Sequence, residues 1–171
     1  DELIRQTGTR VMWWQDYGPV QLLSKEVPMI TPDDMKGKKV RVLGKPSGDF
    51  INAVGGVPVK IGGSEQFLAY QRGTVDVGMT GTTAIQSRKL DETMDWVTIT
   101  NHAQTEFLVV MNDATFDAMS DQEKGWMQEA ALKAEEKMRA ETKDENLASE
   151  KYIAENTEKK VQNLTPEQIE V

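Results

Sequence analysis

The feature that most constrains the fold is an alternation of short apolar runs and short helix-like segments between residues 38 and 111. The apolar runs are bounded by glycine, proline or polar residues, as buried strands are. One intervening segment begins with the helix cap Ser64 and stops at Gly73. This alternation, with its short connections, predicts an α/β fold built on a mostly parallel sheet covered by helices. The expected strands are residues 38–43, 57–61, 75–81, 96–100 and 106–111, and the expected helices are residues 47–56, 64–73 and 83–90.

The N-terminal part of the chain carries its own signals. The first ten residues have the character of a charged helix end, and residues 10–14 predict a strand. Residues 15–20 have the composition of a polar turn, and residues 20–24 predict a second extended piece. Thr31 as N-cap, Pro32 at the first helical position and Gly37 as terminator predict a single helical turn.

The last third predicts one long helix over residues 120–156. This stretch contains no proline and no glycine after Gly125, and the sequence "SDQE" at its start is a capping box. An apolar stripe at fourfold spacing is expected to pack along one side of the domain, because it is too narrow and alanine-rich for a coiled coil. Residues 159–171 predict a strand and a helix that starts at Thr165. We therefore expect two domains, an α/β lobe at 1–119 and the long helix with its C-terminal strand and helix at 120–171. The stripe residues are Trp126, Ala130, Ala134 and Met138.

Charge and composition exclude several function classes. The chain carries 28 acidic and 20 basic residues, with no basic stripe on any expected face, which argues against a nucleic-acid partner. An anionic ligand must therefore be met by a local cationic group. The chain has no cysteine, which rules out disulfides, thiolate catalysis and cysteine zinc sites. No apolar run approaches the roughly 18 residues of a membrane span, and the first residues lack the apolar core of a signal peptide.

The sequence offers little catalytic or metal-binding chemistry. His102 is the single histidine, so a histidine metal cluster is excluded, and we expect its ring to bond nearby backbone at a strand entrance. The pairs at residues 55–56 and 62–63 lack the glycine spacing of phosphate-binding loops and predict turns. Asp33, Asp34 and Asp113 stand at expected helix starts, where capping explains them. We therefore expect no catalytic residue, no metal and no cofactor.

Polar and small residues cluster where the expected strands end. In open α/β sheets, ligands bind in the crevice outside the carboxyl ends of the strands. Arg41 interrupts the otherwise apolar run "KVRVL" without an acid spaced to pair with it in the strand. Its guanidinium is a candidate to bind a carboxylate through two parallel N–H···O bonds, and a structural ion pair is the alternative. The other members of this group are Tyr17, Gln21, residues 62–63 and residues 80–82.

Several motifs together resemble one protein family. The stretches "VPMITPDDMKGKKVRV", "AVGGVPVKI", "SEQFLAYQRGTVDVG" and "VTITNH" are similar, in this order, to the solute-binding proteins of TRAP transporters, the DctP family. The resemblance implies a periplasmic-binding-protein-like (type II-like) two-lobed fold with a long hinge-spanning helix. Because members are considerably longer, it also implies that this chain holds mainly the second lobe and lacks most of the first lobe and the final helices.

The same resemblance assigns roles to residues. Arg41 stands at the family's arginine that pairs with the ligand carboxylate. Gln21 falls where sialic-acid-binding members have a second arginine, Gly63 where they have an aromatic residue and Thr80 where they have an asparagine. These departures argue against sialic acid and imply a roomier, less cationic pocket. Its remaining surface is expected from hydroxyls and from Trp14 or Tyr17, although both aromatic rings could instead belong to the core.

The function that the resemblance implies is a non-enzymatic, monomeric periplasmic receptor. It would bind a small organic acid, close over it by a hinge motion and deliver it to a TRAP membrane permease. Two alternatives come from other classes of protein. An enzyme of similar two-lobed fold would need an acid or base near Arg41, which only His102 could provide, and a cytosolic ligand-sensing domain would be fused to a DNA-binding segment.

Overall fold

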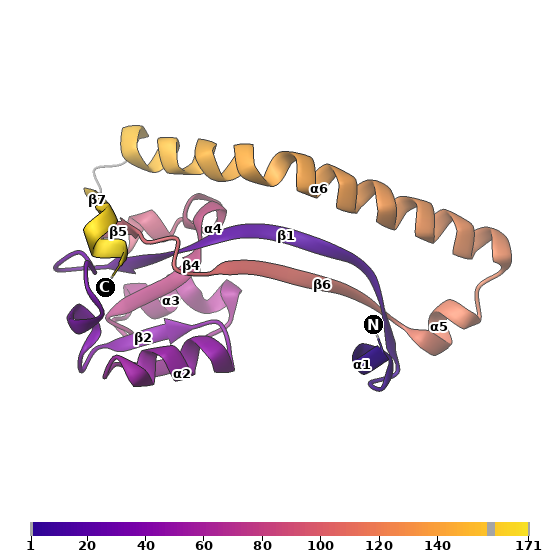
Figure 1. The fold of residues 1–171 in the computed structure, drawn as a ribbon, viewed down its shortest axis with the longest axis horizontal. Helices are drawn as coiled ribbons and strands as arrows, with labels where there is room; N and C mark the ends of the chain where they lie inside the picture. The colour runs from indigo at the N-terminus through magenta and orange to yellow at the C-terminus, as the bar shows by residue number, and fades with distance from the viewer. Residues whose placement is uncertain (1, 157–159, 171) are drawn as a thin grey trace. The chain divides into compact units, whose positions relative to one another are not determined.

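The computed structural model describes residues 2–156 and 160–170. In these residues, short helices and strands precede one helix that is far longer than the rest (Figure 1). The helices are α1 (Glu2–Arg5), α2 (Lys45–Ala53), α3 (Gln66–Gln71), α4 (Thr82–Ser87), α5 (Asp113–Asp117), α6 (Asp121–Asn156) and α7 (Pro166–Ile169), with 3₁₀ turns η1 (Pro32–Met35), η2 (Gly63–Glu65) and η3 (Leu90–Glu92). The strands are β1 (Thr9–Ser24), β2 (Lys39–Val42), β3 (Val57–Lys60), β4 (Val77–Gly81), β5 (Trp96–Ile99), β6 (Gln104–Asn112) and β7 (Lys160–Asn163).

The chain divides into two compact units. Unit 1 comprises Asp1–Gly18 and Thr105–Glu145, and unit 2 comprises Pro19–Gln104 and Asn146–Val171. Each unit therefore combines two chain segments, whereas the domains expected from the sequence, 1–119 and 120–171, are consecutive. Strand β1 and helix α6 each contribute residues to both units.

The sheet of unit 2 is mostly parallel, as the sequence predicts. Its strand order is β3-β2-β4-β1-β5-β7. Strand β2 runs parallel to β3 and β4, and β5 runs parallel to β7. Only β1 on this path runs antiparallel to its neighbours, pairing Gln21 with Thr80 of β4 and Leu22 with Thr98 of β5. The carboxyl ends of β2, β3 and β4 consequently lie at one edge of the sheet.

Strand β1 is longer than the sequence predicts. The polar turn expected at residues 15–20 is absent, because β1 is one strand from Thr9 to Ser24. Gly18 has a φ of 96°, so the backbone departs locally from the extended form without ending the strand. Pairing with β6 accounts for the difference, since hydrogen bonds from a neighbouring strand override the local turn composition.

Two apolar clusters pack on opposite faces of this sheet. Leu22 belongs to the first and Leu23 to the second, as expected for neighbouring residues in a strand. Helix α2 covers the first cluster through Ile51, and α3, α4 and the end of α6 cover the second through Tyr70, Ile85 and Ile153. The first cluster is Val20, Leu22, Met29, Met35, Val40, Val42, Ile51, Val77 and Met79; the second is Leu23, Ala69, Tyr70, Val75, Ile85, Leu90, Met94, Val97 and Ile153.

The ends of the long helix agree with the sequence analysis, but its buried stripe does not. The Ser120 amide donates to the Glu123 carboxylate over 2.8 Å, and the Glu123 amide donates to Ser120 Oγ over 3.3 Å, which is the expected capping box. Trp126 is 60% exposed and Ala130 is exposed, so the expected stripe is wrong at these two residues, whereas Ala134 and Met138 are half-buried. Fourfold spacing advances about 400° per step and so drifts around a helix of 3.6 residues per turn. The buried residues of α6 are Ala131, Thr142, Asn146, Ser149 and Ile153.

The shorter elements mostly lie where the sequence places them. The Asp34 carboxylate accepts hydrogen bonds from the backbone amides of Ile30 and Thr31, which secures the start of the expected helical turn η1. Helix α2 begins at Lys45 rather than at residue 47. The expected C-terminal strand and helix are β7 and α7, although residue 159 of the expected strand lies outside the described residues. No helix in the described part of the chain is both long enough and apolar enough to cross a membrane.

Candidate functional site

The carboxyl ends of β2, β3 and β4 bring most of the predicted ligand-binding residues onto one sheet edge. Arg41 lies in β2, Gly63 follows β3, and Thr80 lies near the end of β4, opposite Gln21 of β1. All four residues belong to unit 2. This edge is where α/β sheets with parallel strands bind ligands.

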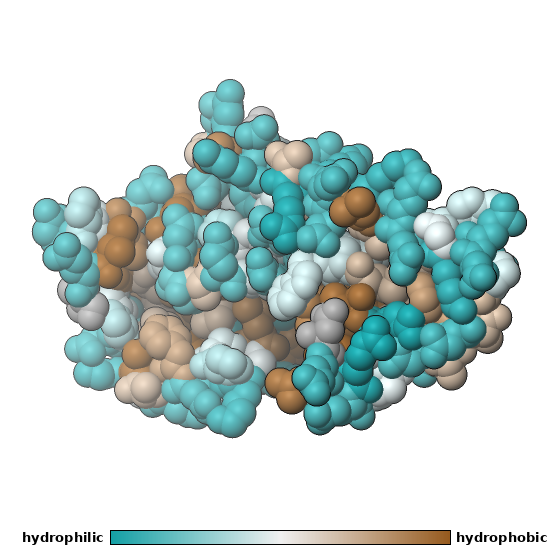
Figure 2. Space-filling model, turned by 45° about the vertical axis from the view of Figure 1, so that its right-hand side comes forward, coloured by the Kyte–Doolittle hydropathy of each residue, from teal (hydrophilic) through white to brown (hydrophobic). Residues whose placement is uncertain are grey.

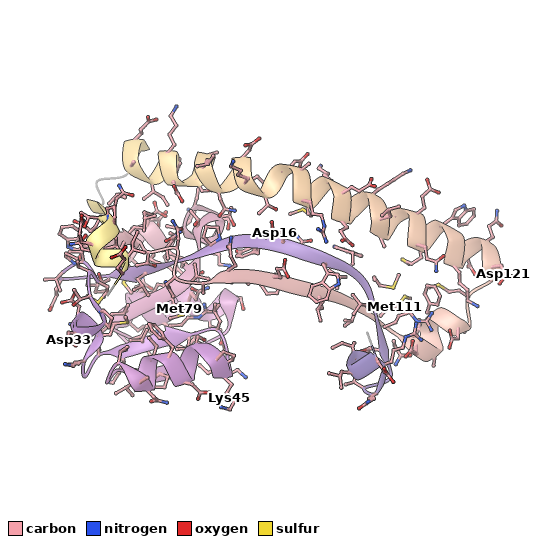
Figure 3. All side chains as sticks on the ribbon, in the orientation of Figure 1. Asp16, Asp33, Lys45, Met79, Met111 and Asp121 are labelled. Atoms are coloured by element: carbon pink, nitrogen blue, oxygen red, sulfur yellow. The ribbon has the colours of Figure 1, made fainter. Side chains whose placement is uncertain are left out.

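The Arg41 guanidinium is buried and tied to backbone carbonyls. Its side chain extends from the face of β2 opposite to Val40 and Val42, which lie in the first apolar cluster. Nε donates to the Ile61 carbonyl over 3.0 Å, and Nη1 donates to the Met79 carbonyl over 2.5 Å. Met79 is labelled on the central strand β4 in Figure 3.

These bonds explain why a buried strand tolerates an arginine. A charge that is only 4% exposed would be costly without hydrogen bonds, and the two carbonyls supply them. Because two separate nitrogens of the fork are held, the plane of the guanidinium is fixed. Ile61 is the first residue after β3, so the head group reaches the carboxyl edge of the sheet.

Gln21 uses its full hydrogen-bonding capacity on protein groups. Its Nε2 donates to Thr82 Oγ1 over 2.9 Å and to Asn101 Oδ1 over 2.7 Å. Its Oε1 accepts from the amides of Thr100 at 2.9 Å and Asn101 at 3.2 Å. A side-chain amide offers two donors and two acceptor lone pairs, so all four are occupied. Gln21 therefore fixes the segment after β5, and its predicted contact with a ligand stays a prediction.

Gly63 lies against an arginine that the sequence analysis did not single out. A Cβ atom at Gly63 would lie 2.8 Å from Nη1 of Arg88 and 3.0 Å from both Cζ and Nη2. The Gly63 carbonyl accepts from Gln66 Nε2 over 3.2 Å, and Gln66 Oε1 accepts from the Tyr70 hydroxyl over 2.8 Å. Nothing in the sequence "QSRKL" distinguishes Arg88 from a surface residue, because its position depends on the fold.

The pKa of the Tyr70 hydroxyl is influenced by positive charges near this edge. Burial raises the pKa of its hydroxyl well above the usual value, while the positive charges of Arg41 and Arg88 act in the opposite direction. The hydroxyl therefore stays protonated and donates to Gln66. Two guanidinium groups thus lie close enough to one side chain to influence its ionisation.

The two predicted aromatic contacts belong to the other unit. Trp14 is 44% exposed, and the Tyr17 ring packs edge-on against Phe107 with centroids 5.2 Å apart. Both residues lie in unit 1, whereas Arg41 and Gly63 lie in unit 2. The roles of Trp14 and Tyr17 therefore stay predictions, as does that of Thr80, which is 1% exposed.

His102 has a different partner from the expected one. Its Nδ1 shares a hydrogen bond of 2.6 Å with the Thr100 hydroxyl, a side chain rather than the expected backbone group. Its ring also stacks on Phe50, with centroids 6.0 Å apart and an interplanar angle of 22°. No group of three or more histidine, aspartate or glutamate side chains among the described residues could hold a metal ion.

Much of the surface is hydrophilic on the face that Figure 2 shows.

Comparison with known proteins places this geometry in a family. Residues 1–171 match the model described as DctP, bacterial extracellular solute-binding protein, family 7. A solute-binding protein of Sulfitobacter sp. (strain NAS-14.1) is 32% identical over 120 residues, which are 70% of this chain and 36% of that protein. The C4-dicarboxylate-binding periplasmic protein DctP of Rhodobacter capsulatus is 26% identical over 127 residues, 74% of this chain and 38% of that protein. The chain thus spans well under half the length of these curated relatives.

Solved structures show the same fold. A TRAP periplasmic solute-binding protein of Sulfurospirillum deleyianum with bound succinate has a TM-score of 0.90 and 25% identity, over 99% of this chain and 56% of that one. A TRAP periplasmic solute-binding protein of Pseudomonas aeruginosa PAO1 with bound L-malate has a TM-score of 0.91 and 18% identity, over 99% of this chain and 60% of that one. The fold and the resemblance expected from the sequence motifs are confirmed.

Proposed function

Because the chain belongs to the DctP family of bacterial extracellular solute-binding proteins, family 7, we propose that it forms part of a periplasmic receptor for a small organic acid. The receptor captures the acid and delivers it to a TRAP-type membrane permease. It acts as a monomer, does not insert into the membrane and performs no chemistry on its ligand. The receptor takes up the acid by closing over it, with the liganded form favouring the closed state.

The fixed guanidinium of Arg41 is the observation that carries this proposal. Two carbonyl bonds hold it at the carboxyl edge of the sheet, so little side-chain entropy remains to be lost when a carboxylate binds. A planar guanidinium matches a carboxylate through parallel hydrogen bonds, which an ammonium group cannot do. Relatives whose structures contain succinate or L-malate support an acid as the ligand.

Titration calorimetry of Arg41→Lys in the full-length protein tests the proposal. Succinate, L-malate, malonate, glucuronate and galacturonate serve as probes, because structures of related proteins contain them. The substitution keeps the charge but loses the fork, so we expect binding to weaken by about 1.5–3 kcal/mol.

A matched control separates binding from a general loss of charge or fold. Arg72→Lys changes an exposed arginine of the same unit and should leave affinity unchanged. Melting curves without ligand show whether Arg41→Lys still folds. Equal affinity of wild type and Arg41→Lys would remove Arg41 from the site, and absence of binding to any of the five acids by the wild type would overturn the proposed function.

A further inference from the structure

The contact between Gly63 and Arg88 has the geometry of a guanidinium lying face-on over a glycine. The position of a Cβ atom at Gly63 is 2.8–3.0 Å from Nη1, Cζ and Nη2 alike. A contact with the edge of the group would leave Cζ clearly farther away than the two nitrogens. The face of the guanidinium therefore packs on the glycine, and any side chain at residue 63 would displace it.

The donors of Arg88 are not used by the described protein groups. Arg88 is exposed, and no ion pair or hydrogen bond joins its guanidinium to any residue in the described ranges 2–156 and 160–170. Because the group packs through its face, its N–H edges remain available to a ligand. In a chain with a net charge of −8, a local cation of this kind is what an anion requires.

Arg88 and Arg41 contact neighbouring residues at the same edge of the sheet. Arg41 donates to the Ile61 carbonyl, and Arg88 lies over Gly63, two residues further along the same loop. Both positive charges act to lower the pKa of the Tyr70 hydroxyl, against the larger effect of burial. One guanidinium is thus buried and held by carbonyls, while the other is exposed and held over a glycine.

We propose that Arg88 is a second ligand-contacting cation and that glycine at residue 63 makes room for it, so that the site selects an acid with a second anionic group. This inference rests on the proposed function and concerns its specificity. It changes the expectation of a roomy, weakly cationic pocket, which considered residues 21, 63 and 80 alone. The space beside Gly63 is occupied by the guanidinium of Arg88, which stands at the C-terminal end of α4.

The test compares a dicarboxylate with its mono-amide in the full-length protein. The tightest binder among malonate, succinate and L-malate is titrated beside the mono-amide of the same acid, which has the same size and one charge fewer. Arg88→Ala should weaken binding of the dicarboxylate by about 10- to 100-fold, the scale of a charge-assisted hydrogen bond, and binding of the mono-amide by less than about threefold.

Gly63→Ala tests the geometry separately from the charge. It keeps Arg88 but pushes its guanidinium away, so it should reproduce the loss for the dicarboxylate. The double variant should then lose no more than Arg88→Ala alone, because both changes remove one interaction. Arg72→Ala, which removes an exposed charge of the same unit, should change affinity by less than about twofold.

The possible results distinguish this inference from the proposed function. If Arg41→Lys weakens binding while Arg88→Ala leaves the dicarboxylate and mono-amide unchanged or weakens both equally, the role of Arg88 is refuted and the receptor function stands. Binding of glucuronate or galacturonate without binding of any dicarboxylate also refutes it. Additive losses in the double variant show that Gly63 does not act through Arg88, and absence of binding to every acid removes the proposed function together with this inference.

Discussion

In strand β2 every side chain from Val40 to Val42 is buried, whereas helix α6 exposes most of its 36 residues. Strand β2 has neighbours on both faces, so even its one charged side chain must find partners in the interior. Helix α6 packs along a narrow line, with Ala131 buried in unit 1 and Ile153 buried in unit 2. In the sheet, burial depends on the face of the strand, and in the helix it depends on the angle around the axis.

A large effect is expected where the end of α6 enters the second apolar cluster. Ile153 is fully buried in the second cluster, and Ile153→Ala should reduce the free energy of unfolding by about 2–5 kcal/mol. Leu147→Ala is the matched control, because the same helix leaves that leucine 53% exposed. Chemical denaturation measures both, and similar losses for the two variants would show that burial does not follow the angle around α6.

Comparing β2 with α6 also explains what the sequence could predict. The side chains of Val40, Arg41 and Val42 point to alternate faces of β2, because side chains in a strand repeat every two residues. It was therefore predictable that Arg41 extends from the face opposite to the two valines. The capping box at Ser120 and Glu123 was predictable because it depends on four consecutive residues. Such features are set by neighbours in the chain.

Features set by distant residues were not predictable. Which face of α6 is buried depends on the groups that pack against the helix, such as the second apolar cluster at Ile153. The spacing of Trp126 and Ala130 in the sequence does not show this face. The turn expected at residues 15–20 disappeared because β6 supplies a pairing partner from elsewhere in the chain. Arg88 and Gly63 are far apart in the sequence, and only the fold brings the guanidinium against the glycine.

The second prediction contrasts two glycines, one from the sheet beside β2 and one from α6. A Cβ atom at Gly78 of β4 would lie 2.4 Å from the Tyr70 hydroxyl oxygen, and nothing lies within 4 Å of one at Gly125 of α6. Gly78→Ala should therefore destabilise the protein by about 1–3 kcal/mol through overpacking. Gly125→Ala should stabilise it by about 0.5–1 kcal/mol through helix propensity. Thermal melts under identical conditions measure both changes, and a shift of the same sign for both would contradict the difference between sheet and helix.

The smallest effect is expected at Trp126, where side-chain size alone would suggest the opposite. The indole is 60% exposed, so truncation removes little buried surface and leaves no closed cavity, and Trp126→Ala should cost less than about 1 kcal/mol. Phe116→Ala is the reference in the same unit, because that ring is 5% exposed and lies 4.0 Å beneath the Arg10 guanidinium. It should cost about 3–5 kcal/mol. Urea unfolding measures the free energy of unfolding of both variants. A loss at Trp126 as large as that at Phe116 would mean that the indole is buried in solution. The face of α6 described as buried in unit 1 would then be wrong.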